Sequence, residues 1–475
     1  MFDSERGART SAGMRDFYVG QGPGLDPLTL FRRMAADVPA YAAFLAENGI
    51  QAEAVRSLSE IPLTTKINYH SPYGLEHRCW HGSLNGCDMV AVSSGSSGRP
   101  TVWPRSVLDE RAVAARFEQV FAGGFQAATR STLAVVCFAL GNWVGGMYTT
   151  AACRHLAAKG YPITVAAPGN DIAEILRVVS ELGPLFDQVV LLGYPPFVKN
   201  VIDAGSGWEA YRIKLVLAGE VFSEAWRDLV SARAAIADPV TDVASLYGTA
   251  DAGVLGNETP LSARIRRFLA DQPAIATPLF GDARLPTLVQ YDPASRFFED
   301  VDGTLAFTAD GALPLMRYHI ADEGGLISHS SMLDLCRAHG FDPGEGPDLP
   351  FVYVFGRSLF TVSFFGANVY PENVTVGLER PHVAGLVTGK FVVSSVEDAD
   401  RDRRLSVVVE LAPGVEGSPS LAATIGESIR AELVRLNSEF AHYVPPDYQV
   451  PLVTLRPAGD PEHFPPGVKH RYTRA

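Results

Sequence analysis

The stretch STLAVVCFAL, residues Ser131–Leu140, is an almost unbroken apolar run that predicts a strand buried on both faces. Three further apolar runs follow it along the chain: YPITVAA (161–167), QVVLLG (188–193) and IKLVLAG (213–219). Between them lies DIAEILRVVSEL (171–182), whose apolar residues recur at helical spacing. This alternation of strands and helices predicts an α/β fold, with a mostly parallel sheet flanked by helices on both sides.

The pattern of the chain changes after about Gly356. Residues 389–411 hold two apolar runs around a charged turn, which predicts a pair of strands. SLAATIGESIRAELVRLNSEF (420–440) has apolar residues at helical spacing, and YQVPLVTLRP (448–457) adds a strand. We therefore expect a small α+β C-terminal domain of residues 359–475 behind a large N-terminal domain of residues 1–358.

Composition and charge exclude several classes of protein. The 475 residues are 47% hydrophobic and 20% charged, which argues against both disorder and a membrane protein. The net charge of -13, with no long basic run, argues against nucleic-acid or anionic-membrane partners. Since no run is long enough to span a bilayer and the N-terminus lacks a signal-peptide pattern, we expect a cytoplasmic protein. Its five cysteines are then expected to be reduced thiols.

A loop rich in serine and glycine lies at residues 92–103, VSSGSSGRPTVW. Gly95 and Gly98 permit turns that direct backbone N–H groups toward one point, and Arg99 adds a fixed positive charge. Further donors are the hydroxyls of Ser93, Ser94, Ser96 and Ser97. These features suit a phosphate-binding loop, but a solvated linker has the same composition, so the loop alone leaves both open. The pattern GxxxxGK[ST] is absent, which argues against a Walker-type nucleotide triphosphatase.

The segment SSGSSGRPT resembles the phosphate loop of the adenylate-forming superfamily, whose usual form is SSGTTGKPT. Within that superfamily the chain is most similar to the phenylacetate–CoA ligase group. This likeness rests on VPAY at Val38–Tyr41, LSEIPLTTK at Leu58–Lys66 and PYG at Pro72–Gly74. Further motifs follow in the family's order, so the resemblance covers almost the whole chain. It implies a large domain that binds ATP and the acyl group, and a small, mobile C-terminal domain.

Two of these motifs imply contacts to a nucleotide. SLYGTAD, Ser245–Asp251, resembles the family's YG[LM][ST]E, so Tyr247 would stack on adenine, with Gly248 and Thr249 beside it. Asp251 would take the catalytic role of the family's glutamate and hold Mg²⁺ bound to ATP, whereas Ala250 lacks the family's hydroxyl. MRYHIAD resembles RYxTGD, and implies that Asp322 accepts hydrogen bonds from both ribose hydroxyls.

Two further segments complete the implied nucleotide site. LAGE (217–220) resembles the family's GAE segment, which assigns Gly219 and Glu220 to the adenine side and Ala218 to the acyl side. GRSLFTVSFFGANVYP (356–371) resembles GRSDDMLIIRGVNVFP and implies a ribose or phosphate contact by Arg357.

The hinge and the catalytic lysine depart from the family pattern. Leu359 and Phe360 replace the paired acids, one of which is the family's hinge between domains. PPGVKHR (465–471) resembles the segment that carries the catalytic lysine, and implies that role for Lys469. Its spacing is one residue short of the family form, and a solvated basic tail is the alternative.

The acyl pocket is assigned to FALGNWVGG, residues 138–146, which occupies the place of the family's acyl-site segment. Phe138, Asn142 and Trp143 are the candidates here, together with Ala218. An aromatic lining with one amide suits an aromatic or otherwise hydrophobic acid, although Phe138 and Trp143 are equally well explained as core residues.

A short stretch near the N-terminus gathers potential zinc ligands, namely His77, Cys79, His81 and Cys87. No regular CxxC pair is present, so we expect buried thiols and surface histidines rather than zinc.

The resemblance implies that a carboxylic acid attacks the α-phosphate of ATP, giving acyl-AMP and pyrophosphate, with Mg²⁺ neutralising the phosphates. CoA is the expected acyl acceptor, and the product a thioester. Because the hinge is altered, transfer to an amine or to a carrier-protein thiol stays an alternative, as does a non-catalytic nucleotide-binding homologue. The sequence fixes neither the acid nor the oligomeric state, for which a homodimer is one option.

Overall fold

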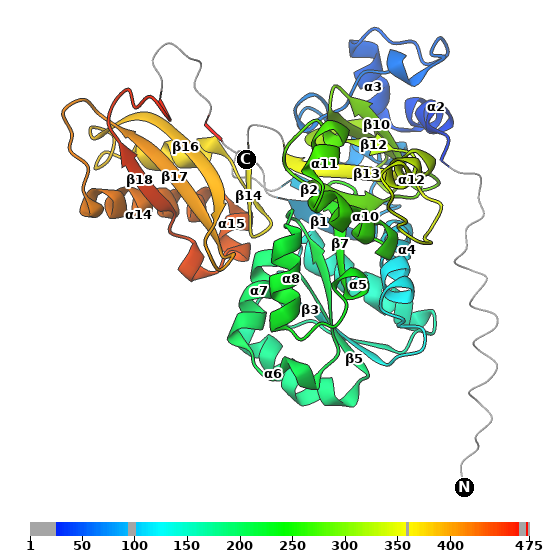
Figure 1. Cartoon of the computed structure of the whole chain (residues 1–475). Coiled ribbons are helices and arrows are strands. Elements are labelled where there is room, and N and C mark those ends of the chain that lie inside the picture. Colours follow the sequence, from blue (N-terminus) through cyan, green and yellow to red (C-terminus); the bar gives the residue numbers. More distant parts are fainter. Residues whose placement is uncertain (1–24, 94–100, 358–360, 465–471, 474–475) are drawn as a thin grey trace.

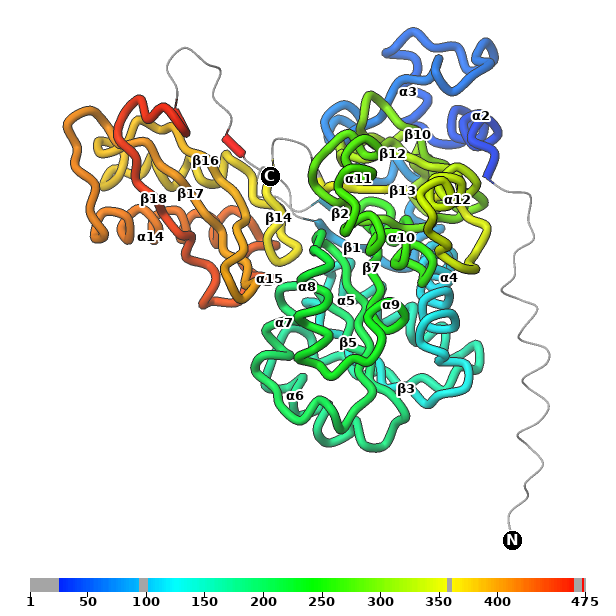
Figure 2. Tube along the Cα trace, in the orientation of Figure 1, coloured from blue at the N-terminus to red at the C-terminus, as the bar shows by residue number. Residues whose placement is uncertain are grey.

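The computed structural model describes residues 25–93, 101–357, 361–464 and 472–473 (Figure 1). They form two lobes: a large domain (25–93 and 101–357) and a C-terminal domain (361–464 with 472–473), which lie side by side in Figure 2. The predicted α/β class with a smaller C-terminal sheet domain is confirmed. The predicted boundary at 358/359 lies outside the described residues. None of the described helices is long and apolar enough to cross a membrane.

The described strands of the large domain form an 11-stranded sheet in the order β10-β11-β12-β13-β9-β8-β7-β6-β5-β3-β4. The four strands predicted from apolar runs lie together and parallel in it, as the series β4-β3-β5-β6, which β7 continues. Every residue of β5 and β3 is buried, because helices cover both faces of this half. Their bounds are β3 Thr132–Val136, β4 Ile163–Ala166, β5 Gln188–Gly193, β6 Ile213–Ala218 and β7 Val243–Thr249.

The other half of the sheet is antiparallel, and the sequence analysis did not locate it. It contains β8 Gly253–Asn257, β9 Thr287–Gln290, β10 Phe297–Val301, β11 Thr304–Ala309, β12 Leu315–Ile327 and β13 Phe351–Arg357. One local signal was present: β10 and β11 are joined by Asp302-Gly303, both with positive φ. An Asp-Gly pair between two short strands is a strong hairpin signal. A separate hairpin pairs β1 (Met89–Ser93) with β2 (Thr101–Arg105).

Helices cover the sheet and begin where the sequence supplies capping groups. The Asp171 side chain accepts a hydrogen bond from the backbone N–H of Glu174 at the start of α6, and Ile175, Val178 and Val179 face the core. The helices of the large domain are α2 Pro27–Asp37, α3 Pro39–Glu47, α4 Val107–Gly123, α5 Val144–Ala158, α6 Ile172–Leu182, α7 Pro195–Ala204, α8 Glu224–Arg233, α9 Pro239–Asp242, α10 Pro260–Ala270, α11 Pro273–Phe280 and α12 His329–Ala338.

The C-terminal domain is a three-stranded sheet packed on helices (Figure 1). β16 (Val387–Glu397) is antiparallel to β17 (Arg403–Leu411), and β17 is parallel to β18 (Leu452–Arg456). The predicted amphipathic helix is α14 (Pro419–Leu436), with Ile425, Ile429 and Leu433 buried. The remaining elements are α13 Pro371–Leu378, α15 Ser438–Tyr443 and the hairpin of β14 Val362–Phe364 and β15 Ala367–Val369.

Ion pairs join the two domains beside α7. The ammonium of Lys199 is fully buried and lies 2.6 Å from Asp203 in its own helix, 3.2 Å from Asp400 and 2.7 Å from Asp402. Arg233 of α8 pairs with Asp203 and Asp400 as well. Since a buried ammonium requires compensating charge, Lys199 favours this docked arrangement of the domains.

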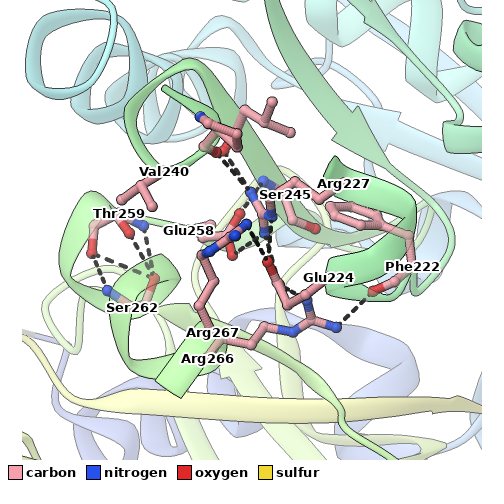
Figure 3. A network of polar contacts seen from close by, with 12 residues as sticks. Phe222, Glu224, Arg227, Val240, Ser245, Glu258, Thr259, Ser262, Arg266 and Arg267 are labelled. Carbon is pink, nitrogen blue, oxygen red and sulfur yellow. Dashed lines mark hydrogen bonds and ion pairs between the residues drawn. The ribbon is translucent and has the colours of Figure 1, made fainter. Parts of the chain in front are cut away.

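A buried network of charges holds the segment after β6 and the first residues of β7 (Figure 3). The Arg227 guanidinium lies 2.9 Å from Glu224 and 2.7 Å from Glu258. Glu258 accepts a hydrogen bond from the backbone N–H of Ser245 at 3.0 Å, and Arg266 donates to the carbonyl of Phe222 at 2.6 Å. Burial alone would lower the pKa of Arg227, but the two glutamates outweigh it and raise that pKa. The network therefore fixes the chain after β6 and at the start of β7.

Replacing Arg227 by methionine is expected to destabilise the protein strongly, because Glu224 and Glu258 would keep buried charges without their shared partner. We expect a loss of about 3–5 kcal/mol in the free energy of unfolding, measured by urea denaturation. The control is Arg177→Met, whose half-exposed pairs with Glu174 and Glu181 should contribute less than about 1 kcal/mol. Equal losses in both variants would contradict the role of the network.

Candidate active site

A cavity of about 1070 Å³ opens at the carboxyl ends of β6 and β7, between the large domain and the C-terminal domain. Ligands in open α/β sheets bind at this edge, because the strand interiors are buried and the polar residues follow the strands. The predicted residues that line the cavity are Ser93, Phe138, Ala218, Gly219 and Glu220, with Tyr247, Gly248, Thr249, Asp251 and Asp322. The fold thus brings most of the described candidates to one place.

Tyr247 of β7 and Asp322 of β12 contact each other at the cavity wall. The Tyr247 hydroxyl donates a hydrogen bond to Asp322 Oδ2 at 2.7 Å, and both residues are buried. The Tyr247 ring stacks on Phe298 with ring centroids 6.3 Å apart. These two residues are 75 positions apart in sequence, and the antiparallel half of the sheet is what brings them together.

Asp251 lies directly after β7, with its carboxylate buried beside two polar partners. Asp251 Oδ2 accepts a hydrogen bond from the Tyr318 hydroxyl at 2.7 Å, and Oδ1 lies 3.5 Å from Lys66 Nζ. Lys66 Nζ is also 3.5 Å from the Ser93 hydroxyl oxygen. Sequence reasoning missed Lys66 as a site residue, although the lysine ends the LSEIPLTTK segment that carried the family resemblance.

A buried histidine packs against the aromatic rings next to Lys66. His70 ends the helical turn Lys66–His70 and packs its ring against Trp103 and Tyr318, at centroid distances of 4.7 and 5.0 Å. Burial and the neighbouring Arg78 lower the pKa of His70 to about 3, so its ring is neutral at physiological pH. His70 therefore holds the aromatic rings behind Lys66 without adding charge to the cavity.

Asp251 is the residue that would have to hold Mg²⁺ here, and it offers a single carboxylate. Mg²⁺ in nucleotide sites is commonly held by one or two carboxylates together with substrate phosphates and water. Asp251 lines the cavity, and its Oδ1 lies 3.5 Å from Lys66 Nζ. The donor set therefore fits Mg²⁺ only when a phosphate ligand supplies further oxygens.

The C-terminal domain closes the opposite wall through its β14–β15 hairpin. The backbone N–H of Gly366 donates to Glu220 Oε1 at 2.7 Å, and the Ser363 hydroxyl donates to the Gly219 carbonyl at 3.3 Å. Gly219 and Gly366 both have positive φ, of 91° and 78°. A Cβ atom on either glycine would lie within 2.8 Å of the Tyr194 ring, so this contact needs glycine on both sides.

Aromatic rings form the end of the cavity next to this hairpin. Tyr194 packs edge-on against Phe138, at a centroid distance of 4.8 Å, and lies against Tyr443 of α15 at 5.2 Å, with the two rings tilted by 34°. Burial raises the pKa of both tyrosine hydroxyls, which are neutral donors under ordinary conditions. Neither Tyr194 nor Tyr443 belongs to a motif in the sequence. Their place at the cavity is evident only because the two domains dock there.

Two acyl-pocket candidates do not reach the cavity wall. The Asn142 side chain is exposed, and its backbone carbonyl accepts a hydrogen bond from Val92 N–H at 2.9 Å. Trp143 is buried behind the cavity, against His442 and Tyr443 of the C-terminal domain. Of the residues predicted from this segment, Phe138 is the one that lines the cavity. The turn before α5 directs the side chains of Asn142 and Trp143 away from it.

Several predicted residues lie outside the described part of the chain: Ser94, Gly95, Ser96, Ser97, Gly98, Arg99, Leu359, Phe360 and Lys469. The described flanks of the phosphate-loop candidate are paired, with Ser93 opposite Thr101, and Ser93 lines the cavity beside Lys66. Arg357 ends β13, where its backbone pairs with Asp322. Ser93 and Asp322, the described neighbours of these candidates, both line the cavity.

The segment with His77, Cys79, His81 and Cys87 does not form a metal-ligand group among the described residues. His77 and His81 are exposed and Cys79 is buried. Where the structure describes the chain, groups with ligand atoms close together are Asp460, Glu462 and His463, and Asp203, Asp400 and Asp402. The second group surrounds the Lys199 ammonium, which supplies the positive charge there.

Comparison with known proteins shows the fold. Neither a protein-family model nor a curated protein matches the chain. A solved structure of 2-hydroxyisobutyryl-CoA ligase, with 2-HIB-AMP and CoA in the thioesterification state, is 16% identical with a TM-score of 0.65. The match covers 94% of this chain and 87% of that chain. The large and small domains thus have the fold of this CoA ligase.

Other structures of the same ligase match less well. Its postadenylation state with R3-HIB-AMP is 15% identical with a TM-score of 0.54, over 94% of this chain and 86% of that chain. An open conformation with 2-HIB-AMP and CoA is 16% identical with a TM-score of 0.52, over 94% and 89%. The predicted likeness to the phenylacetate–CoA ligase group stays a prediction.

Replacing Gly366 by alanine is expected to undock the C-terminal domain. The new Cβ would overlap the Tyr194 ring, which packs between Phe138 and Tyr443. Together with the positive φ, this should cost about 1–3 kcal/mol of unfolding free energy and increase cleavage between the domains in limited proteolysis. Gly385→Ala, with open space around its Cβ, is the control. Identical proteolysis of the two variants would contradict this close contact.

Proposed function

We propose that this chain activates a carboxylic acid with ATP, releasing pyrophosphate, and transfers the resulting acyl group to the thiol of CoA. The observation that carries the proposal is a single cavity at the carboxyl ends of β6 and β7, bounded by both domains. One end has the Tyr247–Asp322 pair and the Asp251–Lys66 pair, and the other end has the Phe138 and Tyr194 rings. A polar end and an aromatic end suit a nucleotide and an apolar acid.

At the polar end, we assign the nucleotide to the residues around β7 and β12. Tyr247 stacks on adenine, with Gly248 and Thr249 beside it, while Asp322 accepts hydrogen bonds from the ribose. The loop of residues 94–99 and Arg357 contact the phosphates, and Gly219 and Glu220 lie between the adenine and the acyl group. Asp251 holds Mg²⁺ together with the phosphates, and the ion neutralises charge on them.

The main electrostatic barrier is the approach of a carboxylate to an α-phosphate of the same sign. Cations placed at the reacting oxygens lower this barrier, because charge builds there in the transition state. We assign this role to Lys66, whose ammonium lies between Asp251 and Ser93, and to Lys469. Both lysines have a long stem that brings a point charge to the phosphate.

At the aromatic end, Phe138, Tyr194 and Ala218 surround the acyl group and exclude water from the mixed anhydride. The C-terminal domain completes this wall through Gly366 and Tyr443. The higher TM-score against the thioesterification state, 0.65 against 0.54 for the postadenylation state, supports assigning the described arrangement to the transfer step.

The proposal is tested with a panel of aryl, alkenyl and alkyl acids, scored by pyrophosphate release in the presence of ATP and Mg²⁺. An acid that is turned over is then incubated with CoA, and we expect a product with the mass of the CoA thioester. Amide formation with added amines, without a thioester, would replace CoA by an amine as the acceptor. If no acid of the panel gives pyrophosphate, although the protein still binds ATP, the proposal that the chain adenylates an acid is contradicted.

Replacing Lys469 by alanine or Lys66 by methionine should each reduce pyrophosphate release by about 100-fold or more, as expected for loss of a group that stabilises transition-state charge. The rate with a turned-over acid is compared with that of Arg430→Met, an exposed cation on α14 that pairs with Glu427. A lysine variant that keeps the parent rate would lose its assigned role.

A further inference from the structure

A buried carboxylate lies where the two domains meet at the aromatic end of the cavity. The Glu220 side chain is 1% exposed, and its Oε1 accepts the Gly366 N–H at 2.7 Å. The other oxygen, Oε2, is buried and accepts no hydrogen bond from the residues that the structure describes. A buried carboxylate oxygen without a donor costs free energy, so this position favours a ligand that donates a proton or carries positive charge.

The nearest cation does not fully compensate this charge. Arg403 Nη1 lies 3.4 Å from Glu220 Oε2, while Nη2 donates to the Val221 carbonyl at 2.7 Å and lies 3.2 Å from Glu397. One guanidinium is therefore shared between two carboxylates. Burial raises the pKa of Glu220 in spite of Arg403 and the Gly366 N–H. An additional cation beside Glu220 would stabilise the ionised carboxylate.

A second carboxylate lines the same wall. Glu439 of α15 is buried, and its Oε2 faces the backbone and side-chain nitrogens of Asn368 at 3.3 and 3.4 Å. Burial is the largest cause of the raised pKa of Tyr194, and the charges of Glu439 and Glu220 raise this pKa further. The two carboxylates therefore act on the same hydroxyl. The cavity wall here is acidic, because Glu220, Glu397 and Glu439 all line it and Arg403 pairs with the first two.

The aromatic rings at this end add a second attraction for positive charge. Phe138, Tyr194 and Tyr443 pack around the cavity wall that Glu220 and Glu439 also line. The faces of aromatic rings attract ammonium groups, most strongly where water is excluded. Carboxylates beside aromatic faces in a desolvated pocket are a suitable environment for an alkylammonium group, and a poor one for the phosphates of a nucleotide.

We propose that the Glu220–Glu439 end of the cavity binds a primary amino group, carried either by the acid substrate or by the acyl acceptor. The inference rests on the adenylation step of the proposed function and names the chemical class of one of its substrates; an acceptor that carries the amino group would take the place of CoA. If the acid carries the group, the carboxylates select amino acids of suitable length over neutral acids. If the acceptor carries it, a deprotonated amine forms a C–N bond to the acyl carbon while the bond to the phosphate oxygen breaks. AMP then leaves, and the second proton of the amine passes to Glu220 or to water.

Direct binding tests the site without any chemistry. Benzylamine and benzyl alcohol, which differ mainly in charge, are titrated into the full chain by isothermal titration calorimetry. Benzylamine should bind at least about tenfold more tightly, and Glu220→Gln and Glu439→Gln should each remove most of this preference. Glu181→Gln, an exposed carboxylate on α6, should leave it unchanged. Equal binding of the two probes, or a preference that survives both glutamine variants, would overturn the proposal. Since Glu439→Gln leaves the Glu220–Gly366 hydrogen bond in place, it keeps the test valid if Glu220→Gln disturbs folding.

Two further measurements distinguish the source of the amino group. In the first, pyrophosphate release is compared for 4-(aminomethyl)benzoate with 4-methylbenzoate, and for 6-aminohexanoate with hexanoate. An amino-acid preference of about tenfold or more in kcat/KM, lost in Glu220→Gln, assigns the group to the acid. In the second, benzylamine is added to enzyme, ATP and a neutral acid, and an amide product assigns it to the acceptor. If neutral acids are adenylated but neither an amino-acid preference nor an amide product is found, the proposal is overturned.

Failure of the proposed function gives a different result from failure of this inference. No pyrophosphate release from any acid, with benzylamine still bound through Glu220, would contradict adenylation and leave the amine site standing. Pyrophosphate release from neutral acids with equal binding of benzylamine and benzyl alcohol would support adenylation and overturn the amine site.

Discussion

The parallel strands at the centre of the large domain are buried on both faces, and this constraint determines where chemistry can occur. β3 and β5 have no exposed residue, so a charged side chain within them would lose its hydration without compensation. Polar groups are therefore confined to the strand ends, where Glu220 follows β6 and Asp251 follows β7. The cavity is a consequence of this separation between apolar interiors and polar ends.

The C-terminal domain completes the cavity rather than lying beside it. Gly366 reaches the end of β6 because neither it nor Gly219 has a side chain, and Tyr194 fills the space that two Cβ atoms would occupy. On the outer side of the same interface, Lys199 is held among aspartates from both domains. Any rotation of the domains has to separate these charges, so the ion pairs and the close glycine contact together favour one docked state.

The resemblance in sequence located part of the site, for physical reasons that can be stated for each residue. Tyr247, Asp251 and Asp322 were predictable because each lies within a short motif that resembles the family, and the structure places all three on the cavity wall. Asn142 was named from the same kind of evidence, but its side chain points to solvent. A motif shows which residues are near one another along the chain. The local direction of the backbone decides which of their side chains face the cavity.

The sequence by itself determined the α/β class, the four parallel strands and the small C-terminal sheet domain, because apolar periodicity is a local property. It also carried the Asp302-Gly303 hairpin signal for part of the antiparallel half. Only the tertiary structure decided that Tyr247 meets Asp322, that Lys66 lies beside Asp251, and that Tyr443 and Glu439 border the same cavity. These contacts join residues far apart in the chain, and packing of sheet halves and domains, rather than local preference, sets such distances.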